Sequence, residues 1–517
     1  MKHKFDENMN SEQLKYKDKV LSEVKEGKRG SSYAGLKKLS MAPGDVIEPG
    51  FQLPHHVEQG LSNKESVEKI ADFFAQVSQE YSPLNIQELP PNVRTYLDSD
   101  LDSQSGPNLS VYDVYSRIVK AKKPNGIIPG DLPKKLTKLF PEYLAFPSST
   151  VFNKITQSKV YPPQWKVENQ IPIPKVYPPE SEDDLRNISK TQFLSKVYES
   201  FIAEWLLPII QPFLDPDQCG LKGFSITHYL IKLLHFTHSV LDKKQPHAVL
   251  TACVDFSKAF NRVSHALLVQ DLYDMHTPAW LLNIIVSYLS DRSMVMSHMG
   301  DTSLSRSLPG GGPQGALLGG IMFMVKFNGA FLRRPIPPHI KGPVTKSTSK
   351  KVKFVDDGSV AVSINLKLNL VPDPVERPKP LTFHERNELV LPAANNLLQY
   401  YLSDTEKFAV ENQMVINPKK TKVICFNKTR KWNFPPEVHF SDNKTLQYET
   451  EVKLVGVIVS DDLKWVKNTE YIVQKAMTKI WVLRRMKNIG LEPEHIFDSY
   501  TKELRSVLEL YQSGTVA

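Results

Sequence analysis

Residues 354–362 have the sequence Phe-Val-Asp-Asp-Gly-Ser-Val-Ala-Val, in which two acids stand between apolar flanks. This pattern predicts strand, turn and strand over residues 353–364, with Asp356 and Asp357 at the turn. Two carboxylates at the tip of an apolar hairpin are costly to hold near a core unless a cation compensates their charge. The stretch therefore predicts a metal-binding hairpin, with an exposed surface turn as the alternative.

The context of this pair distinguishes it from the other Asp-Asp pairs. A chain of 517 residues should contain about one such pair by chance, and this chain contains three. Asp183-Asp184 lies in an acidic stretch that begins at Glu180, which indicates a solvated loop. Asp461-Asp462 follows Val459-Ser460, which indicates a turn after a strand.

A further acid, Asp255, ends a run of the same kind. Residues 248–256 are apolar and rich in β-branched side chains, and polar or Pro-containing segments bound them on both sides. This predicts a buried strand that ends at Asp255. An acid at that position is either a metal ligand or the N-cap of the next helix.

Helical periodicity frames these strands. Ser62 and Glu65 form a capping-box pattern at the start of a predicted helix that ends before Pro83. Thr277 and Pro278 mark the start of another helix. Further helices are predicted over residues 190–214, 226–241 and 467–510. One more helix starts near Ser264, another runs through Met324, and another ends at about Glu411. Short strands are predicted near Lys420 and over residues 452–459.

Composition favours a nucleic-acid partner inside the cell. The formal net charge of +9 and the pI of about 9.0 suit a polyanion. The three cysteines form no CxxC pair, so neither a disulfide framework nor a zinc knuckle is expected. Residues 1–19 are polar, and no run of about 18 apolar residues occurs. We expect localisation in the nucleus or cytoplasm, with no membrane association and no small-molecule cofactor.

A series of motifs occurs in a consistent order along the chain. The motifs are Pro163-Gln164-Trp165-Lys166 with Ile171-Pro172-Ile173-Pro174-Lys175; Arg186-Asn187-Ile188-Ser189 with Lys196 and Glu199; Gln218-Cys219-Gly220-Leu221; Val254-Asp255-Phe256-Ser257-Lys258-Ala259-Phe260; Leu308-Pro309-Gly310-Gly311-Gly312-Pro313-Gln314-Gly315; Phe354-Val355-Asp356-Asp357; Asn417-Pro418-Lys419-Lys420-Thr421-Lys422; and Leu454-Val455-Gly456. One such motif would be weak, whereas the ordered set is strong. The set resembles the reverse transcriptases, particularly those of the non-LTR (LINE-type) retrotransposon group.

The resemblance implies a two-metal nucleotidyl transfer. Asp255, Asp356 and Asp357 would hold two Mg²⁺ ions, or Mn²⁺ in their place, with the backbone carbonyl of Phe256 as a further ligand. One ion would lower the pKa of the primer 3′-hydroxyl, and the other would hold the triphosphate and its leaving pyrophosphate.

The same resemblance implies a nucleotide-binding set. Lys175 and Arg186 would hold the triphosphate, and Lys420 would donate a proton to pyrophosphate. Gln314 and Gly315 would contact the incoming nucleotide or the template base. The alternative for the cations is ordinary surface charge.

Phe260 distinguishes two classes of polymerase. It stands five residues after Asp255, where a bulky ring would crowd a ribose 2′-hydroxyl and favour deoxynucleotides. RNA-templated RNA polymerases usually place an Asp there, and the remaining alternative is a core aromatic. Gly310, Gly312 and Gly315 also satisfy G-x-G-x-x-G, but Pro313 interrupts the pattern and the preceding strand is poor, which argues against a dinucleotide site.

Two basic regions are candidates for binding template and primer phosphates. Residues 331–353 hold seven Lys or Arg and no acid, and the C-terminal helical region is also basic. For both, the alternative is a solvated face. The candidate nucleic-acid-binding residues are Lys350, Lys351, Lys475, Lys479, Arg484 and Arg485.

The expected fold is an α+β right hand. We expect a polar N-terminal arm over residues 1–60, a helical lead-in over 61–150, fingers and palm over 151–460, and a partial helical thumb over 461–517. The fingers would come from about 150–245. The palm, a small antiparallel sheet backed by helices, would come from about 246–330 and 350–460.

Three departures from the family pattern leave alternatives open. Asn261 stands where the group usually has Asp, residues 123–127 lack an expected Asp, and the chain stops at Ala517 soon after the thumb begins. We predict an RNA-directed DNA polymerase of a retrotransposon-like element that uses an RNA template, a DNA or RNA primer and dNTPs. The alternatives are an RNA-templated RNA polymerase and a truncated, non-catalytic nucleic-acid-binding relic.

Overall fold

The structure, a computed structural model, describes most of the chain as two compact units. One comprises Phe51–Tyr229 and Phe236–Glu449, and the other contains Leu230–His235 and Thr450–Ala517. The predicted arm up to residue 50 and residues 123–127 lie outside the described residues. The described ranges are 51–99, 106–121, 128, 130–176, 178–220, 223–243, 247–330, 349–365, 383–427, 438–442, 444–488 and 490–512.

The larger unit begins with helices. The predicted capping box is confirmed at α4 (Asn63–Ser78), where Ser62 accepts from the Glu65 N–H and Glu65 accepts from the Ser62 N–H. The neighbouring helices are α3 (Pro54–Glu58), α5 (Pro91–Asp98), α6 (Val111–Lys120), α7 (Lys134–Leu139) and α8 (Pro141–Ser158). One face of α4 packs into a hydrophobic core. Its buried apolar residues recur at helical spacing and include Val67, Ile70 and Phe74.

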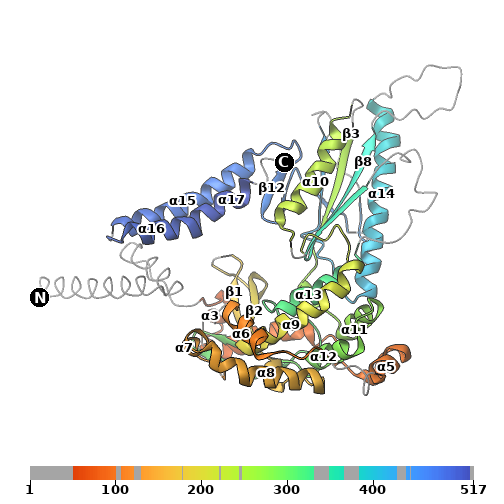
Figure 1. The fold of residues 1–517 in the computed structure, drawn as a ribbon. Coiled ribbons are helices and arrows are strands. Elements are labelled where there is room, and N and C mark those ends of the chain that lie inside the picture. The colour runs from red at the N-terminus through yellow and green to blue at the C-terminus, as the bar shows by residue number, and fades with distance from the viewer. Residues whose placement is uncertain are drawn as a thin grey trace, which may run out of the picture. The chain divides into compact units, whose positions relative to one another are not determined.

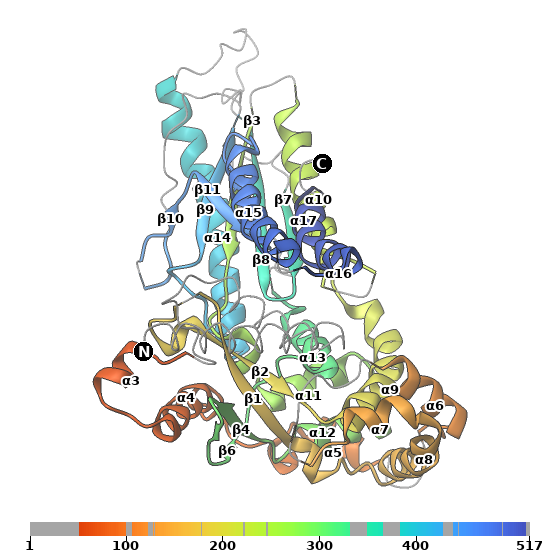
Figure 2. The same ribbon diagram turned by 90° about the vertical axis from the view of Figure 1, so that its left-hand side faces the viewer.

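One sheet joins strands that lie far apart in the chain. Its strands are β1 (Val167–Pro174), β2 (Leu185–Lys190), β4 (Ser293–His298), β5 (Asp301–Thr302) and β6 (Arg306–Ser307). β1 pairs antiparallel with β2 and parallel with β4, and α4 packs on β4 (Figure 2). Strands within residues 293–307 therefore belong to the same sheet as β1 and β2, and the assignment of these residues to the palm stays a prediction.

A second sheet has the strand order β10-β9-β3-β8-β7. All its pairings are antiparallel except the short parallel pair of β10 with β9, so the expected small antiparallel sheet is found with one parallel edge. Its central strand and its acidic hairpin confirm the predicted strands. The strands are β3 (His247–Val254), β7 (Ser349–Phe354), β8 (Asp357–Asn365), β9 (Lys422–Asn427) and β10 (Gln447–Tyr448).

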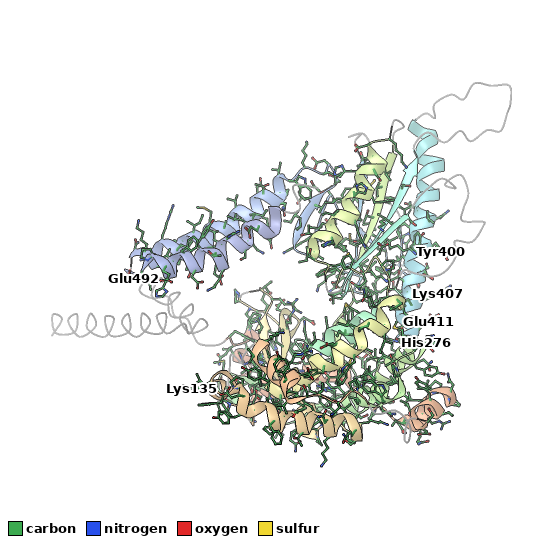
Figure 3. The ribbon with its side chains drawn as sticks, in the orientation of Figure 1. Lys135, His276, Tyr400, Lys407, Glu411 and Glu492 are labelled. Carbon is green, nitrogen blue, oxygen red and sulfur yellow. The ribbon has the colours of Figure 1, made fainter. Side chains whose placement is uncertain are left out.

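Helices cover this sheet and bury its apolar side chains. α14 (Phe383–Glu411) runs along β8 and β3 (Figure 1). The exposed Lys407 and Glu411 mark the outer side of α14, whereas Leu402 and Phe408 are buried (Figure 3). The other helices of this unit are α9 (Phe193–Ile210), α11 (His265–Asp274), α12 (Ala279–Leu289) and α13 (Leu317–Phe327), and α10 (Ile226–Leu241) has residues in both units. α12 begins one residue later than predicted, with Pro278 rather than Thr277 at its N-cap.

Two buried ion pairs fasten the strands. Arg292 lies 3.1 Å from Glu168, which also accepts hydrogen bonds from Ser189 Oγ and Gln170 Nε2. Lys353 lies 2.7 Å from Asp215 and donates to two backbone carbonyl oxygens. Removing one member would leave a buried charge without a partner, at a cost of about 3–5 kcal/mol.

The smaller unit consists of a hairpin and helices. β11 (Glu451–Leu454) and β12 (Val457–Ser460) form the hairpin, whose turn contains Val455 and Gly456. The helical segments are α15 (Val466–Asn488), α16 (Pro493–Ser499), a π-helical turn (Tyr500–Arg505) and α17 (Ser506–Gln512). The C-terminal part of this unit begins at Thr450, and the start of a thumb at residue 461 stays a prediction.

The fold class is α+β, as predicted. None of the helices among the described residues is long and apolar enough to span a membrane.

Candidate functional site

Three acids meet at the ends of neighbouring strands. In the pairing of β3 with β8, Val254 stands opposite Gly358, so Asp255 and Asp357 extend from facing positions at the same end of the two strands. Phe354 pairs with Asp357, which leaves Val355 and Asp356 as the two turn residues of the β7–β8 hairpin. The pattern of antiparallel pairing thus brings together acids that lie about a hundred residues apart in the chain.

Burial disfavours the charged form of these three acids and so raises their pKa values. Burial is the main cause that raises the pKa of Asp255 and of Asp356. Burial, reinforced by the charges of Asp356 and Asp255, raises the pKa of Asp357 to about 7. Adjacent buried carboxylates that repel one another are the donor set that a divalent cation compensates, because oxygen ligands suit Mg²⁺ and Mn²⁺.

The turn that carries Asp356 has an unusual backbone. Val355 has φ of +56°, a left-handed conformation that β-branched residues rarely adopt. Gln218 holds it there, since its Oε1 accepts from the Val355 N–H at 3.0 Å and its Nε2 donates to the Val355 carbonyl at 3.4 Å. Gly220 fits beside this turn because a Cβ on it would meet the Val355 side chain at 2.9 Å. The Gln218-Cys219-Gly220 segment therefore supports the acidic turn.

A second loop supports Asp255. The Asn417 N–H donates to the Asp255 carbonyl at 2.8 Å, and the Asp255 N–H donates to Thr421 Oγ1 at 3.3 Å. These bonds place Lys420 close to the acids, with its Nζ 3.9 Å from Asp255 Oδ2. The Lys420 side chain remains 63% exposed, so it is accessible to a ligand.

Three cations gather beside the three acids. Lys175 follows β1, Arg186 lies on β2, and Lys420 lies before β9. Partial desolvation and the charges of Lys420 and Arg186 lower the pKa of Lys175, which shows that the cations lie within electrostatic range of one another. Arg186 and Lys420 in turn oppose the upward shift in the pKa of Asp356. The structure thus brings the predicted metal and triphosphate residues to one place.

The two phenylalanines that follow Asp255 differ in burial. Phe256 is 4% exposed, and its ring meets Phe327 edge-on at 5.1 Å. Phe260 is partly buried and stacks on Phe323 with ring centroids 4.8 Å apart. Phe260 therefore has a core partner as well as an accessible side.

The Gly-rich segment docks on the loop that carries Phe260. The Gly312 N–H donates to the Phe260 carbonyl at 2.8 Å, and the Gln314 carbonyl accepts from the Ser189 N–H of β2 at 2.8 Å. Gly315 has φ of +117°, and a Cβ on it would meet the Ser189 carbonyl at 3.1 Å. Gln314 and Gly315 consequently lie between β2 and the loop that follows β3.

Several supporting residues escaped prediction. Ser78 of α4 both accepts from the Gly310 N–H and donates to the Gly310 carbonyl. His265 Nε2 lies 2.7 Å from the Gly311 carbonyl, and burial lowers the pKa of His265 to about 4, so its ring is neutral and donates that hydrogen bond. Both residues resemble ordinary helix residues in the sequence, and no local signal marks their role.

The described lysines of the basic segment 331–353 contact other residues of the protein. Lys350 pairs with Asp217 at 2.7 Å, Lys351 lies over the Tyr401 ring, and Lys353 is fully buried. Their charges are therefore largely engaged within the protein, and the rest of that basic segment, residues 331–348, lies outside the described residues.

Four further candidates lie on α15 in the smaller unit. Lys479 pairs with Glu503 at 2.7 Å, Lys475 lies over the Tyr471 ring, and Arg485 lies over the Trp481 ring. Lys475, Arg484 and Arg485 are at least partly accessible to solvent. Glu503 neutralises Lys479.

Comparison with known proteins shows a clear similarity over this site. A profile of the family described as "Reverse transcriptase (RNA-dependent DNA polymerase)" matches residues 173–459, more than half of the chain. The "Probable RNA-directed DNA polymerase from transposon BS" of Drosophila melanogaster is 31% identical over 180 residues, which is 34% of this chain and 19% of that protein. The "RNA-directed DNA polymerase from mobile element jockey" of the same organism is 23% identical over 446 residues, 82% of this chain and 44% of that protein. The chain spans less than half the length of either relative.

Proposed function

This chain belongs to the reverse transcriptase (RNA-dependent DNA polymerase) family, and on that premise we propose that it is an RNA-directed DNA polymerase of a retrotransposon-like element of the non-LTR group. The observation that carries the proposal is the gathering of Asp255, Asp356 and Asp357 beside Lys175, Arg186 and Lys420. The acids suit divalent metal ions, and the cations suit a triphosphate. One site therefore has both kinds of group that nucleotidyl transfer needs.

The acids of this site fit divalent metal ions. Three partly or largely buried carboxylates have raised pKa values, and the nearest described cation, Lys420, is still 3.9 Å from Asp255. Asp255, Asp356 and Asp357 would hold two Mg²⁺ or Mn²⁺ ions, with the Phe256 carbonyl as a candidate further ligand. When bound, such ions activate a 3′-hydroxyl and neutralise the leaving pyrophosphate.

The chain's own side chains would bind and orient the reactants. Lys175 and Arg186 would grip the triphosphate from the β1–β2 hairpin, as cations opposite phosphate do. Lys420 would supply a proton to the departing pyrophosphate. Gln314 and Gly315 would line the nucleotide or template base, and Phe260 would exclude a ribose 2′-hydroxyl.

The proposal assigns the right-hand subdomains. The sheet of β1, β2 and β4 would belong to the fingers, the sheet of β3, β8 and β9 to the palm, and α15 to the thumb. RNA template, a DNA or RNA primer and dNTPs would be the partners. The protein would act in the nucleus or cytoplasm.

Primer extension tests the proposal. The purified chain, an RNA template, a DNA primer and Mg²⁺ should extend the primer with deoxynucleotides. Asp356→Ala should lower the rate by about 10³-fold or more, because it removes a metal ligand worth several kcal/mol. Asp461→Ala is the matched control, since it changes the first acid of another Asp-Asp pair, in the smaller unit.

Two results would contradict the proposal. Preferential use of ribonucleotides would indicate an RNA-templated RNA polymerase. Tight nucleic-acid binding by a folded protein that extends no primer would indicate a non-catalytic relic.

A further inference from the structure

Apart from the acidic site, the larger unit contains two histidines and a glutamate whose potential metal-ligand atoms lie close together. His55 and His56 lie on α3, and Glu182 begins the 3₁₀ turn η3 (Glu182–Asp184) between β1 and β2. The Nε2 atoms of His55 and His56 lie 3.1 and 3.0 Å from Glu182 Oε1. One ligand atom from each of the three residues lies within 4.8 Å of the other two.

Among the described residues, the buried Nε2 atom of His56 has no hydrogen-bond partner. Its side chain is 3% exposed, and its Nε2 makes no hydrogen bond although it lies 3.0 Å from Glu182 Oε1. The other ring nitrogen, Nδ1, contacts Ser66 Oγ of α4 at 2.8 Å. A metal-ligating histidine has this arrangement, in which one nitrogen is aimed at the ion while the other donates to a fixed partner.

We propose that His55, His56 and Glu182 bind one Zn²⁺ ion, with water as the fourth ligand. Two imidazoles and a carboxylate suit zinc, whereas Mg²⁺ prefers oxygen ligands. Bonds of about 2.0–2.2 Å in a tetrahedron place neighbouring ligand atoms roughly 3.3–3.5 Å apart. The 3.0 and 3.1 Å separations between nitrogen and oxygen already approach that spacing.

The ion would join α3 to the tip of the β1–β2 hairpin. Glu182 is adjacent to Asp183, whose carbonyl accepts from Lys175 Nζ at 2.7 Å. Fixing Glu182 would therefore limit the movement of the segment that positions Lys175. The role that we assign to the zinc is positional, and the inference does not depend on polymerase activity.

Zinc binding to the purified full-length chain tests this site. The chain would be stripped with a chelator, exchanged into millimolar Mg²⁺ to occupy the acidic site, and titrated with Zn²⁺ against a chromophoric chelator. We expect one tight equivalent, and a Co²⁺ titration should give the visible absorption of a tetrahedral ion with the same stoichiometry. Both signals should persist in Asp356→Ala, which separates this site from Asp255, Asp356 and Asp357.

Variants identify the ligands. His55→Ala and Glu182→Gln should each weaken binding at least about 10-fold and abolish the Co²⁺ band, and Ser66→Ala should weaken binding by about 10- to 100-fold. His55 is partly exposed, so His55→Ala should fold even if a substitution at the buried His56 does not. Glu180→Gln, an exposed acid two residues before Glu182, should bind as the unchanged chain does.

The outcomes are decisive in either direction. Absence of a tight equivalent in millimolar Mg²⁺ would overturn the proposal, as would unchanged binding in a folded Glu182→Gln variant. Loss of binding in Asp356→Ala would assign the ion to the acidic site instead.

Discussion

The ring of Phe260 stacks on Phe323, as a core aromatic would. Phe260 also stands five residues after Asp255, where a bulky ring would crowd a ribose 2′-hydroxyl. If its accessible side meets the sugar of the incoming nucleotide, Phe260→Val should raise use of ribonucleotides relative to deoxynucleotides. A change of roughly 10- to 100-fold in the ratio of kcat/KM values is expected for removing that much side chain. Single-nucleotide incorporation with matched dNTP and rNTP measures the ratio.

Phe323→Leu is the matched control for this prediction, because it removes the stacking partner and leaves Phe260 in place. It should lower stability without changing sugar selectivity. If Phe260→Val lowers stability alone, Phe260 is only a core aromatic.

The acids also predict a pH dependence of stability. The pKa of Asp357 is about 7 in the folded chain, above the value of about 3.9 for an unperturbed Asp. Between those pH values the folded state binds more protons than the unfolded state. Stability in the presence of a chelator should therefore fall as pH rises from about 4 to about 7, by an amount on the order of a few kcal/mol.

Thermal unfolding with EDTA across this range measures the effect. Asp357→Asn should unfold with a shallower pH dependence, and Mg²⁺ should stabilise the unchanged chain most at the upper end of the range. An equal slope in Asp357→Asn would show that the shift belongs to other groups.

At the scale of elements, the β7–β8 hairpin depends on a side chain from outside it. Gln218→Leu would leave the partly buried N–H groups of Val355 and Gly220 without their acceptor, each at a cost of up to about 1–3 kcal/mol. The left-handed turn at Val355 would relax, so primer extension should fall by about 10-fold or more in a folded protein.

Gln399→Leu provides the comparison, since Gln399 bridges the backbone of His439 through the same two kinds of hydrogen bond. It should lower stability similarly while retaining extension. Equal losses of extension in both variants would mean that Gln218 acts only through general stability.

Two adjacent glycines of α13 predict opposite effects. A Cβ on Gly319 would lie 2.4 Å from the Pro313 carbonyl oxygen, so Gly319→Ala should displace the Gly-rich segment and lower both stability and extension. Beyond the adjacent residues and the nearby backbone of its own helix, no atom in the described part of the chain lies within 4 Å of a Cβ on Gly320, so Gly320→Ala should stabilise the helix by about 0.5–1 kcal/mol. Unfolding midpoints of the two variants check this, and a neutral Gly319→Ala would contradict the packing described.

Elements defined by local pattern were predicted well. β3, the acidic hairpin and the capped helix α4 follow from alternation, apolar runs and capping residues. The pairing of β4 with β1 was not predicted, because the two strands lie more than a hundred residues apart and no local signal specifies their register. The ion pair of Lys350 with Asp217 and the hydrogen bond of His265 to Gly311 were not predicted for the same reason, since the partners are distant in sequence.

At the scale of the whole molecule, the solvent-facing cations of α15 predict salt-dependent binding. Replacing Lys475, Arg484 and Arg485 together with Ala should weaken binding to an RNA–DNA duplex. The slope of log K against log salt should become shallower by up to about 3, since each of the three side chains can neutralise one phosphate. Lys479→Ala should have little effect, because Glu503 already neutralises that charge. Fluorescence anisotropy over a salt series measures both, and an unchanged slope in the triple variant would indicate a merely solvated face.

The parallel pairing of β1 with β4 has a consequence for synthesis of the chain. The β1–β2 hairpin is complete once residue 190 has left the ribosome, but β4 begins only at residue 293. At roughly 5–20 residues per second, the open edge of β1 waits on the order of 5 to 20 seconds for its partner strand. During that interval it offers unpaired backbone groups to any neighbouring nascent chain. Slow translation between these strands should therefore lower the yield of soluble protein, and chaperone binding to the stalled hairpin should restore it.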